Sequence, residues 1–190
     1  MATRSARPDF HGGKVVAVSS DDKHRFSKPV RPSIRLLEGF GIEGDGHAGR
    51  FVKHRWLARR NRQMENLRQV HLMHEELFEQ LREEGFKVGP GDLGENITTR
   101  GIELLSLPLG CLIHVGETAV LQATGVRVPC SYIDRFQKCL KRLMISKTPK
   151  GTPVYKSGIM AIVQSGGTVA AGDPVRIVLP SEPWALLPPL

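Results

Sequence analysis

Residues 158–177, GIMAIVQSGGTVAAGDPVRI, decide the fold class of this chain. The apolar, partly β-branched run of residues 158–164 predicts a strand, and a second such run follows at residues 174–179. Gly166-Gly167 and Gly172-Asp173 are turn signals on either side of the residues between these runs. Short strands joined by glycine turns are typical of antiparallel β structure.

The same pattern recurs along the rest of the chain. Residues 111–115 and 118–124 predict a hairpin across Gly116-Glu117, because two apolar runs flank a short turn. Residues 68–72 alternate polar and apolar side chains like a half-buried strand. Further strands are predicted at residues 13–20 and 33–37.

Helical patterns are few. Residues 74–84 carry apolar side chains at helical spacing and stop at Gly85, and residues 131–144 predict a second helix. Many short strands with few helices predict an α+β, mainly β domain centred on a β-barrel with a few peripheral helices. Within the 190 residues we expect an N-terminal extension at 1–12, one domain at 13–180, and a proline-rich C-terminal tail at 181–190 that wraps or frays.

The net charge of +8 is concentrated in the first third of the chain. Residues 1–68 hold 15 lysines and arginines against 7 acids, whereas residues 69–190 hold 12 of each, so the excess lies before residue 69. Its densest part, residues 50–68, fits a nucleic-acid surface, a site for an anionic ligand, or a solvated loop. We do not expect nucleic acid as the partner, because this segment has two aromatic residues and no helix-turn-helix or RNP pattern.

The cysteine and hydropathy patterns indicate the compartment. The three cysteines show no CxxC spacing, so they predict neither a disulfide framework nor a zinc ribbon. No apolar run approaches the length of about 18 residues that a membrane span needs. These features predict a soluble, cytoplasmic protein with no membrane partner.

Cys130 is the strongest candidate for chemistry. It ends the segment after a predicted strand, lies three residues after Arg127, and precedes a capping-box pattern at residues 131–134. A helix N-terminus and an arginine both favour thiolate over thiol, so the pattern predicts a reactive or metal-binding sulfur. The alternative is a small side chain that packs at a strand-to-helix corner. Cys111, in an apolar strand, and Cys139, in the middle of the second predicted helix, should react slowly.

Glycine-rich loops carry further polar candidates. Five of the eleven positions in residues 39–49 are glycine, and this loop presents Asp45 and His47 either as site residues or as a turn residue and a surface histidine. Residues 88–99 form a second glycine-dense segment, which contains Asn96. His71 and His74 fall on different predicted elements, so a histidine-based metal site is not expected there.

Together these motifs resemble the MOSC domain, which is named after the C-terminal domain of molybdenum-cofactor sulfurase. The resemblance covers about residues 13–180 and rests on several separate motifs in the right order. They are GIEGDGHAG at 41–49, RQVHLMHEE at 68–76, GDLGENITTRGIELLSLPLG at 91–110, TGVRVPC at 124–130, and residues 158–177.

The resemblance implies a β-barrel-centred fold and a role with the molybdenum cofactor, Mo-molybdopterin. Cys130 occupies the position of the family's cysteine, which implies that it is the molybdenum ligand or a persulfide carrier; thiolate suits a soft metal. The resemblance also implies that Asp45, His47, Arg68, Asn96 and Arg127 bind the pterin or its phosphate, with Arg127 or Arg68 as the bidentate partner.

The implied function is cofactor binding or sulfur transfer through Cys130, and reduction of N-hydroxylated compounds is its more specific form. We expect no counterpart here of the pyridoxal-phosphate domain of fused sulfurases or of the second β-barrel domain of amidoxime-reducing members. The implied partners are therefore molybdopterin, a redox or sulfur-donor protein, and a second copy of the chain in a homodimer that completes the pocket.

Two other classes of function compete with this interpretation. A non-catalytic module would bind anions or nucleic acid through its basic first third and keep Cys130 for packing. A cysteine hydrolase would need a histidine base such as His47 or His114 beside Cys130, and the sequence does not place one there.

Overall fold

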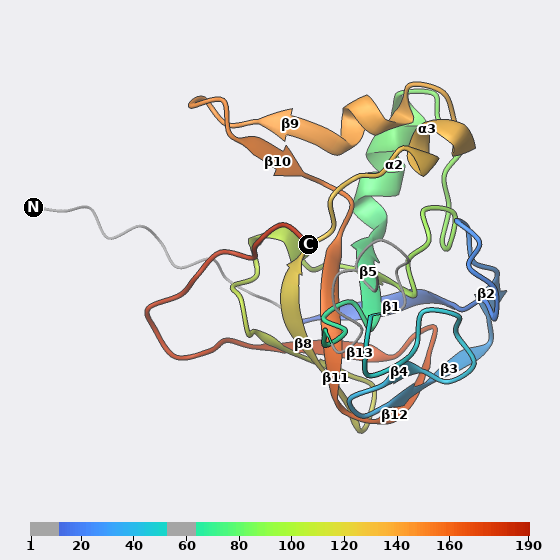
Figure 1. Ribbon diagram of the computed structural model, residues 1–190, viewed down its shortest axis with the longest axis vertical. Coiled ribbons are helices and arrows are strands. Elements are labelled where there is room, and N and C mark those ends of the chain that lie inside the picture. The colour runs from blue at the N-terminus through green and yellow to red at the C-terminus, as the bar shows by residue number, and fades with distance from the viewer. Residues whose placement is uncertain (1–11, 53–63) are drawn as a thin grey trace, which may run out of the picture.

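The protein is mainly β, with a closed seven-stranded barrel and two α-helices among the described residues. The structure is a computed structural model that describes residues 12–52 and 64–190. In Figure 1 the barrel fills the lower part of the molecule, and both helices lie above it beside a protruding hairpin. The predicted fold class is therefore confirmed.

The barrel wall is antiparallel except at one place. Strands β5 and β6 run parallel, and the pairing of Gly13 with Val175 joins the first strand to the last and closes the barrel. Strand β2 (Val30–Arg31) extends β1 outside the closed wall. Around the barrel the strands follow the order β13 (Pro174–Val178), β7 (Leu112–Val115), β8 (Ala119–Val126), β11 (Ile159–Ser165), β5 (Val70–His74), β6 (Ile97–Arg100) and β1 (Gly13–Ser19).

Smaller elements surround the barrel. A three-stranded sheet and a two-stranded hairpin are separate from the barrel wall, and no helix in the described residues is long and apolar enough to span a membrane. These elements are β3 (Ser33–Leu37), β4 (Gly41–Ile42), α2 (Glu75–Glu83), η1 (Leu104–Ser106), α3 (Tyr132–Phe136), η2 (Leu140–Met144), β9 (Ile145–Lys147), β10 (Pro153–Tyr155) and β12 (Gly167–Ala170).

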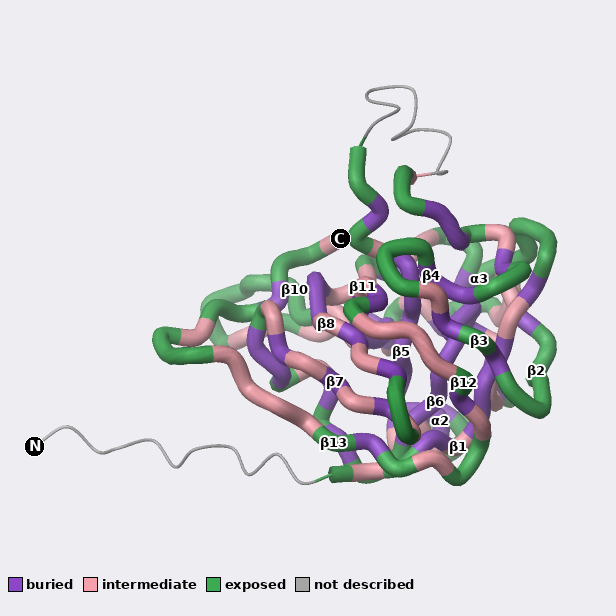
Figure 2. Tube along the Cα trace, turned by 90° about the horizontal axis from the view of Figure 1, so that it is seen from below, coloured by how far each residue is buried: buried purple, intermediate pink, exposed green. Residues whose placement is uncertain are grey.

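The interior of the barrel is the main hydrophobic core. Along β8, Ala119, Leu121 and Ala123 are buried while the residues between them are partly exposed, as the alternation of a strand requires. Figure 2 shows buried segments alternating with more exposed ones along the strands of the wall. Every strand of the barrel contributes buried side chains to this one cluster.

A second core lies between the outer side of the barrel wall and the helices. Strand β5 serves both cores: Val70 and Leu72 belong to the interior cluster, and Met73 packs with Leu77 and Phe78 of α2. The prediction that residues 68–72 form a half-buried strand was wrong in the bounds of the strand and in its burial. The strand begins at Val70 and is covered on both faces, which buries His71.

Most of the other predicted elements are confirmed. The 111–124 hairpin pairs Val115 with Ala119 as its turn requires, and the 74–84 helix appears as α2. Strand β6 was not predicted, because it begins inside the glycine-dense segment 88–99 and its ITTR sequence has no strong apolar alternation.

The last residues of the chain run beside β8. The backbone N–H of Leu190 donates to the Val126 carbonyl at 2.9 Å, and that of Val126 donates to the Pro188 carbonyl at 2.8 Å. Further back, the Leu109 N–H donates to the Ala185 carbonyl. The proline-rich segment therefore wraps along the end of β8, next to the segment that carries Cys130.

We expect Gly158→Ala to destabilise the protein more than Gly151→Ala. Both glycines have a positive φ, 79° and 81°, which costs an L-residue about 1–2 kcal/mol. A Cβ on Gly158 would lie 2.1 Å from the Leu72 carbonyl oxygen, whereas one on Gly151 meets no heavy atom within 4 Å. Urea unfolding should show that Gly158→Ala lowers the free energy of unfolding by about 1–3 kcal/mol more than Gly151→Ala does. If both variants lose the same free energy of unfolding, the close approach of Gly158 to β5 does not contribute to stability.

Candidate functional site

Cys130 lies on a short connection that leaves β8 and enters α3. Its side chain is half-buried. The connection is held at both sides, because the Arg127 N–H donates to the Gly158 carbonyl at 3.0 Å and the Val128 N–H donates to the Leu190 carbonyl at 3.2 Å. The sulfur therefore sits on backbone that β11 and the C-terminal segment fix in place.

The predicted helix over residues 131–144 is not continuous. Helix α3 ends at Phe136, and Gln137 has extended backbone. The side-chain amide of Gln137 pairs instead with the backbone of Lys87, accepting from its N–H at 3.1 Å and donating to its carbonyl at 2.6 Å. This long-range pairing replaces the next helical turn.

The predicted capping box is also wrong. Ser131 makes no capping hydrogen bond, and Asp134 accepts instead from the Lys141 N–H at 2.9 Å. A five-residue helix carries little macrodipole, so the helix does not supply the positive charge near Cys130. Arg127 therefore supplies the positive charge near Cys130.

The other two cysteines differ in accessibility. Burial raises the pKa of Cys111 to about 11, which agrees with its prediction as a slow thiol. Cys139 was placed in mid-helix, but it is exposed and has a left-handed backbone with φ 69° at the start of η2. The argument that its position in a helix makes it slow was therefore wrong.

The guanidinium of Arg127 is the fixed positive charge beside Cys130. Its Nη1 donates to the Leu93 carbonyl and contacts Nδ1 of His71, both at 2.9 Å. Burial lowers the pKa of Arg127, while the interactions with Cys130 and with the Glu95 carboxyl act in the opposite direction. An arginine remains protonated even so, and its cation therefore lies where it can stabilise an anionic sulfur.

His71 fixes the position of Arg127 by a hydrogen bond. The guanidinium can only donate, so Nδ1 of His71 accepts, and Nε2 carries the proton that it donates to the Ser157 carbonyl at 2.7 Å. Burial, with the charge of Arg127, lowers the pKa of His71 well below its usual value. The ring is therefore neutral and acts as a fixed acceptor for the arginine.

Asp45 and Asn96 form a buried network next to this pair. Asp45 Oδ2 accepts from Lys28 Nζ at 2.7 Å and from Asn96 Nδ2 at 3.2 Å. Asn96 Oδ1 accepts from the His71 N–H at 3.1 Å. Burial would raise the pKa of Asp45, but the bonds from His47 and the charge of Lys28 outweigh it and hold that pKa well below its usual range.

The structure thus brings all six predicted site residues into one connected region. Asp45 contacts His47 and Asn96 directly, and the Asn96 side chain meets the His71 backbone. Arg68 is half-buried, burial lowers its pKa, and its charge acts on Arg127.

Three residues of this region were not singled out by sequence. His71 was considered only as a metal ligand, a role that was not expected, and neither Lys28 nor Glu95 was named as a candidate. The carboxyl of Glu95 is fully buried, and burial raises its pKa although Gly91 N–H donates to Oε1. A lysine in a polar segment and an acid that follows a glycine give no local signal of burial, so neither could have been found by pattern alone.

Three buried polar atoms near these residues have no partner in the described structure. They are Oγ of Ser19, whose carbonyl accepts from Asn96, Oε2 of Glu95 and Oγ of Ser157. The carbonyl of Ser157 accepts from the ring of His71. The carbonyl of the next residue, Gly158, accepts from the backbone N–H of Arg127. A buried hydroxyl without a partner is costly, so it marks a place where a bound polar molecule would satisfy it.

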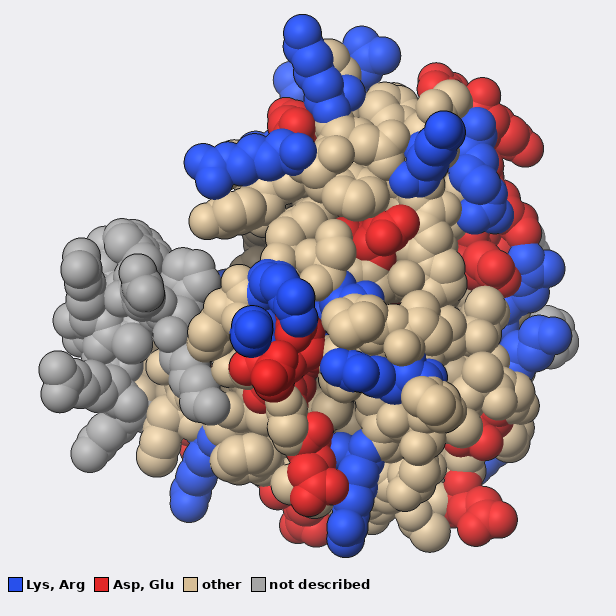
Figure 3. Space-filling model, turned by 90° about the vertical axis from the view of Figure 1, so that its right-hand side faces the viewer, with Lys and Arg blue, Asp and Glu red and all other residues tan. Residues whose placement is uncertain are grey.

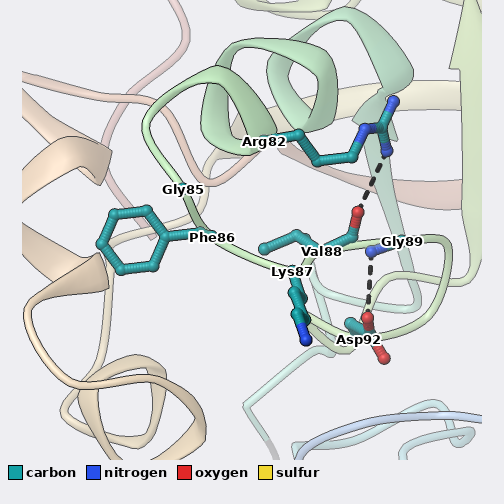
Figure 4. A pocket seen from close by; sticks show the side chains of 7 residues that line it. All are labelled: Arg82, Gly85, Phe86, Lys87, Val88, Gly89 and Asp92. Atoms are coloured by element: carbon teal, nitrogen blue, oxygen red, sulfur yellow. Dashed lines mark hydrogen bonds between the residues drawn. The ribbon is translucent and has the colours of Figure 1, made fainter.

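A surface pocket of about 550 Å³ lies beside α2, on its C-terminal loop. Figure 4 shows Arg82 and Asp92 turned toward the loop backbone, where they bond Val88 and Gly89. None of the six predicted site residues lines this pocket, so we do not connect it with Cys130.

The basic run at residues 50–68 is described only in part, because residues 53–63 lie outside the described residues. On the face shown in Figure 3, acidic and basic side chains lie side by side near the centre of the view. Among the described residues, no group of three or more histidine, cysteine or acidic side chains is placed to hold a metal ion.

The sequence of residues 47–176 matches the MOSC domain family model, which covers more than half of the chain. The chain belongs to the MOSC domain family. The matched range of this MOSC domain contains Cys130 and four of the other five predicted site residues, and Asp45 lies two positions before it.

Solved structures share the fold of this MOSC protein. The YuaD protein from Bacillus subtilis superposes with a TM-score of 0.71 at 23% identity, covering 91% of this chain and 99% of that one. YiiM from Escherichia coli gives 0.59 at 20% identity, with 90% and 73% covered. YiiM from Geobacillus stearothermophilus gives 0.57 at 20% identity, with 87% and 73% covered. A comparison with curated protein sequences gives no significant match.

We expect Asp45→Asn to lower the free energy of unfolding of this MOSC domain by about 3–5 kcal/mol at pH 7, because Lys28 is left buried without its counter-charge. The folded-state pKa of Asp45 lies below the unfolded value of 3.8, so its contribution is present above pH 4 and lost as the pH falls further. Urea unfolding of both proteins at pH 7 and pH 3 measures this.

The partly exposed pair of Arg100 with Glu75 is the matched control for that prediction. Glu75→Gln should lower the free energy of unfolding by about 1 kcal/mol or less. The interpretation fails if Asp45→Asn costs no more than this control, or if its effect is the same at both pH values.

We expect a thiol reagent to modify Cys130 and Cys139 in the folded protein and Cys111 only after unfolding, because Cys111 is buried. Arg127→Gln should slow modification of Cys130 and leave that of Cys139 unchanged, since Arg127 interacts with the sulfur of Cys130 and can stabilise an anion formed there during the reaction. Mass spectrometry of timed samples follows each cysteine. Equal slowing at both would indicate a general change of the fold, and no slowing at Cys130 would remove Arg127 from the chemistry.

Proposed function

We propose that this MOSC protein binds the molybdenum cofactor or carries sulfur for it, with Cys130 as the residue that acts. The observation that carries the proposal is the guanidinium of Arg127, which the Leu93 carbonyl and His71 hold beside the half-buried sulfur of Cys130. A packing cysteine needs no fixed cation at its side. A sulfur that acts as a thiolate or persulfide does.

The donor set fits the cofactor. Thiolate is a soft ligand, which suits molybdenum better than hard oxygen ligands do. The pterin carries a phosphate, and Arg127, which interacts with the cysteine and with the charge of Arg68, supplies positive charge for it. The buried hydroxyl of Ser157, which has no partner in the described structure, is a further hydrogen-bonding group on the same side of the barrel.

Each residue then has a distinct task in the proposal. Cys130 supplies the sulfur, either as a metal ligand or as the atom that holds a persulfide. Arg127 keeps an anionic sulfur or phosphate in place, and His71 keeps Arg127 in place because a neutral imidazole accepts its hydrogen bond. Asp45 and Asn96 use their polar atoms on protein partners, so in this proposal they orient the site rather than touch the pterin.

The finer alternatives depend on the partner. If the cofactor stays bound, it supplies two-electron redox chemistry, such as reduction of N-hydroxylated compounds with electrons from a redox protein. If it does not, Cys130 receives sulfane sulfur from a donor protein and passes it on. Both alternatives need the ionised sulfur and the same cation beside it.

We expect Cys130→Ser to fold normally and to lose molybdenum, or transferable sulfur, to the background level. A serine hydroxyl does not ionise near neutral pH and cannot form a persulfide. The exchange changes little volume at a half-buried position. Molybdenum is measured by elemental analysis and sulfane sulfur by cyanolysis, in protein produced in a host that makes the cofactor.

Cys139→Ser is the matched control, because Cys139 is exposed and lies on the following turn. It should keep the wild-type metal, sulfur and melting temperature. Retention of both metal and sulfur by Cys130→Ser would remove the cysteine from the chemistry, and unfolding of Cys130→Ser but not of Cys139→Ser would assign it a packing role.

A further inference from the structure

Two histidines from separate loops meet at the surface. Nδ1 of His24 lies 3.5 Å from Nε2 of His47, with the ring centroids 4.8 Å apart and the ring planes at 86°. His24 is exposed, and about half of the His47 side chain is exposed. They are 23 residues apart in sequence, so the fold brings them together.

The buried carboxylate of Asp45 fixes the orientation of His47. Its Oδ1 lies 3.2 Å from Nδ1 of His47 and also accepts from the His47 backbone N–H at 2.9 Å. Lys28 and Asn96 hold the other oxygen of Asp45. An ionised carboxylate can only accept, so Nδ1 carries the proton and the lone pair of His47 is on Nε2, the atom that faces His24.

This arrangement is the one that histidine ligands of metal ions adopt. A metal-bound histidine usually donates its other ring N–H to a carboxylate, which fixes the tautomer and raises the basicity of the ligand. Two nitrogens bound to one tetrahedral zinc ion at about 2.0–2.1 Å lie about 3.3–3.4 Å from each other. The separation of 3.5 Å between Nδ1 of His24 and Nε2 of His47 is close to this distance.

We propose that His24 Nδ1 and His47 Nε2 form a two-histidine site for a divalent transition-metal ion, with Asp45 as the carboxylate behind it. Imidazole suits zinc, nickel and copper, whereas magnesium prefers oxygen ligands. No third histidine, cysteine or acid completes the set among the described residues, so water or another molecule fills the remaining positions. The ion keeps its full charge between two neutral ligands, which makes those open positions attractive to an anion.

The site does not depend on Cys130 or on the proposed function. Its ligands lie on the loop after β1 and on the glycine-rich loop after β4, whereas Cys130 follows β8. A thiolate would also bind zinc, so the test must separate the two.

The test is isothermal titration of the full chain with NiCl2 and ZnCl2, with MgCl2 as the control ion. We expect one equivalent of nickel or zinc to bind, and His24→Ala and His47→Ala each to weaken this binding at least tenfold. His114→Ala, at a partly exposed position on β7, and Cys130→Ser should leave it unchanged. The melting temperature should rise with nickel in the wild type and not in the double variant His24→Ala/His47→Ala.

Binding that is lost in Cys130→Ser and kept in both histidine variants would overturn the proposal and assign the ion to the thiol. If the wild type binds nickel or zinc no better than the double variant does, the proposal is also overturned, and the two histidines are only a hydrogen-bonded pair. Because both side chains are exposed, the variants should fold, and their melting temperatures without metal check this.

Discussion

The side-chain amide of Asn96 is the contact on which the candidate site depends. It accepts from the His71 N–H of β5, and it donates to the Ser19 carbonyl of β1 and to Asp45 on the glycine-rich loop. One buried residue thus joins two barrel strands to the loop that carries His47. All of its hydrogen-bonding atoms are used, and a buried amide that lost one partner would leave that partner unsatisfied.

The site lies on the outer side of the barrel wall because β5 is covered on both faces. Its inward side chains fill the barrel, and its outward ones, Met73 and His71, lie under α2 and the loops. Burial makes His71 a neutral acceptor and makes the ion pair of Lys28 with Asp45 costly to break. The same burial that stabilises the outer core therefore sets the protonation state of the groups that position Arg127.

Local patterns failed where a long-range contact competed with them. Residues 131–134 have the composition of a capping box, but Gln137 bonds Lys87 in place of the next turn, and Asp134 bonds Lys141. Lys28 lies between Ser27 and Pro29 in a polar segment and Glu95 follows Gly94, surroundings that normally indicate solvent, and both residues are buried. Their burial cannot be recognised from the residues around them, because it is the packing of distant segments that covers them.

The sequence by itself determined the class of the fold and the family, and it predicted Cys130 as the centre of the candidate site. Strand alternation and glycine turns are local, so the 111–124 hairpin and α2 follow directly from them. The tertiary structure decided which charges face one another. The strand order places Arg127, just after β8, against His71 of β5, because β11 pairs with both strands. The loops around it pair His24 with His47. These contacts are set by strand order and register, which no single segment of the chain encodes.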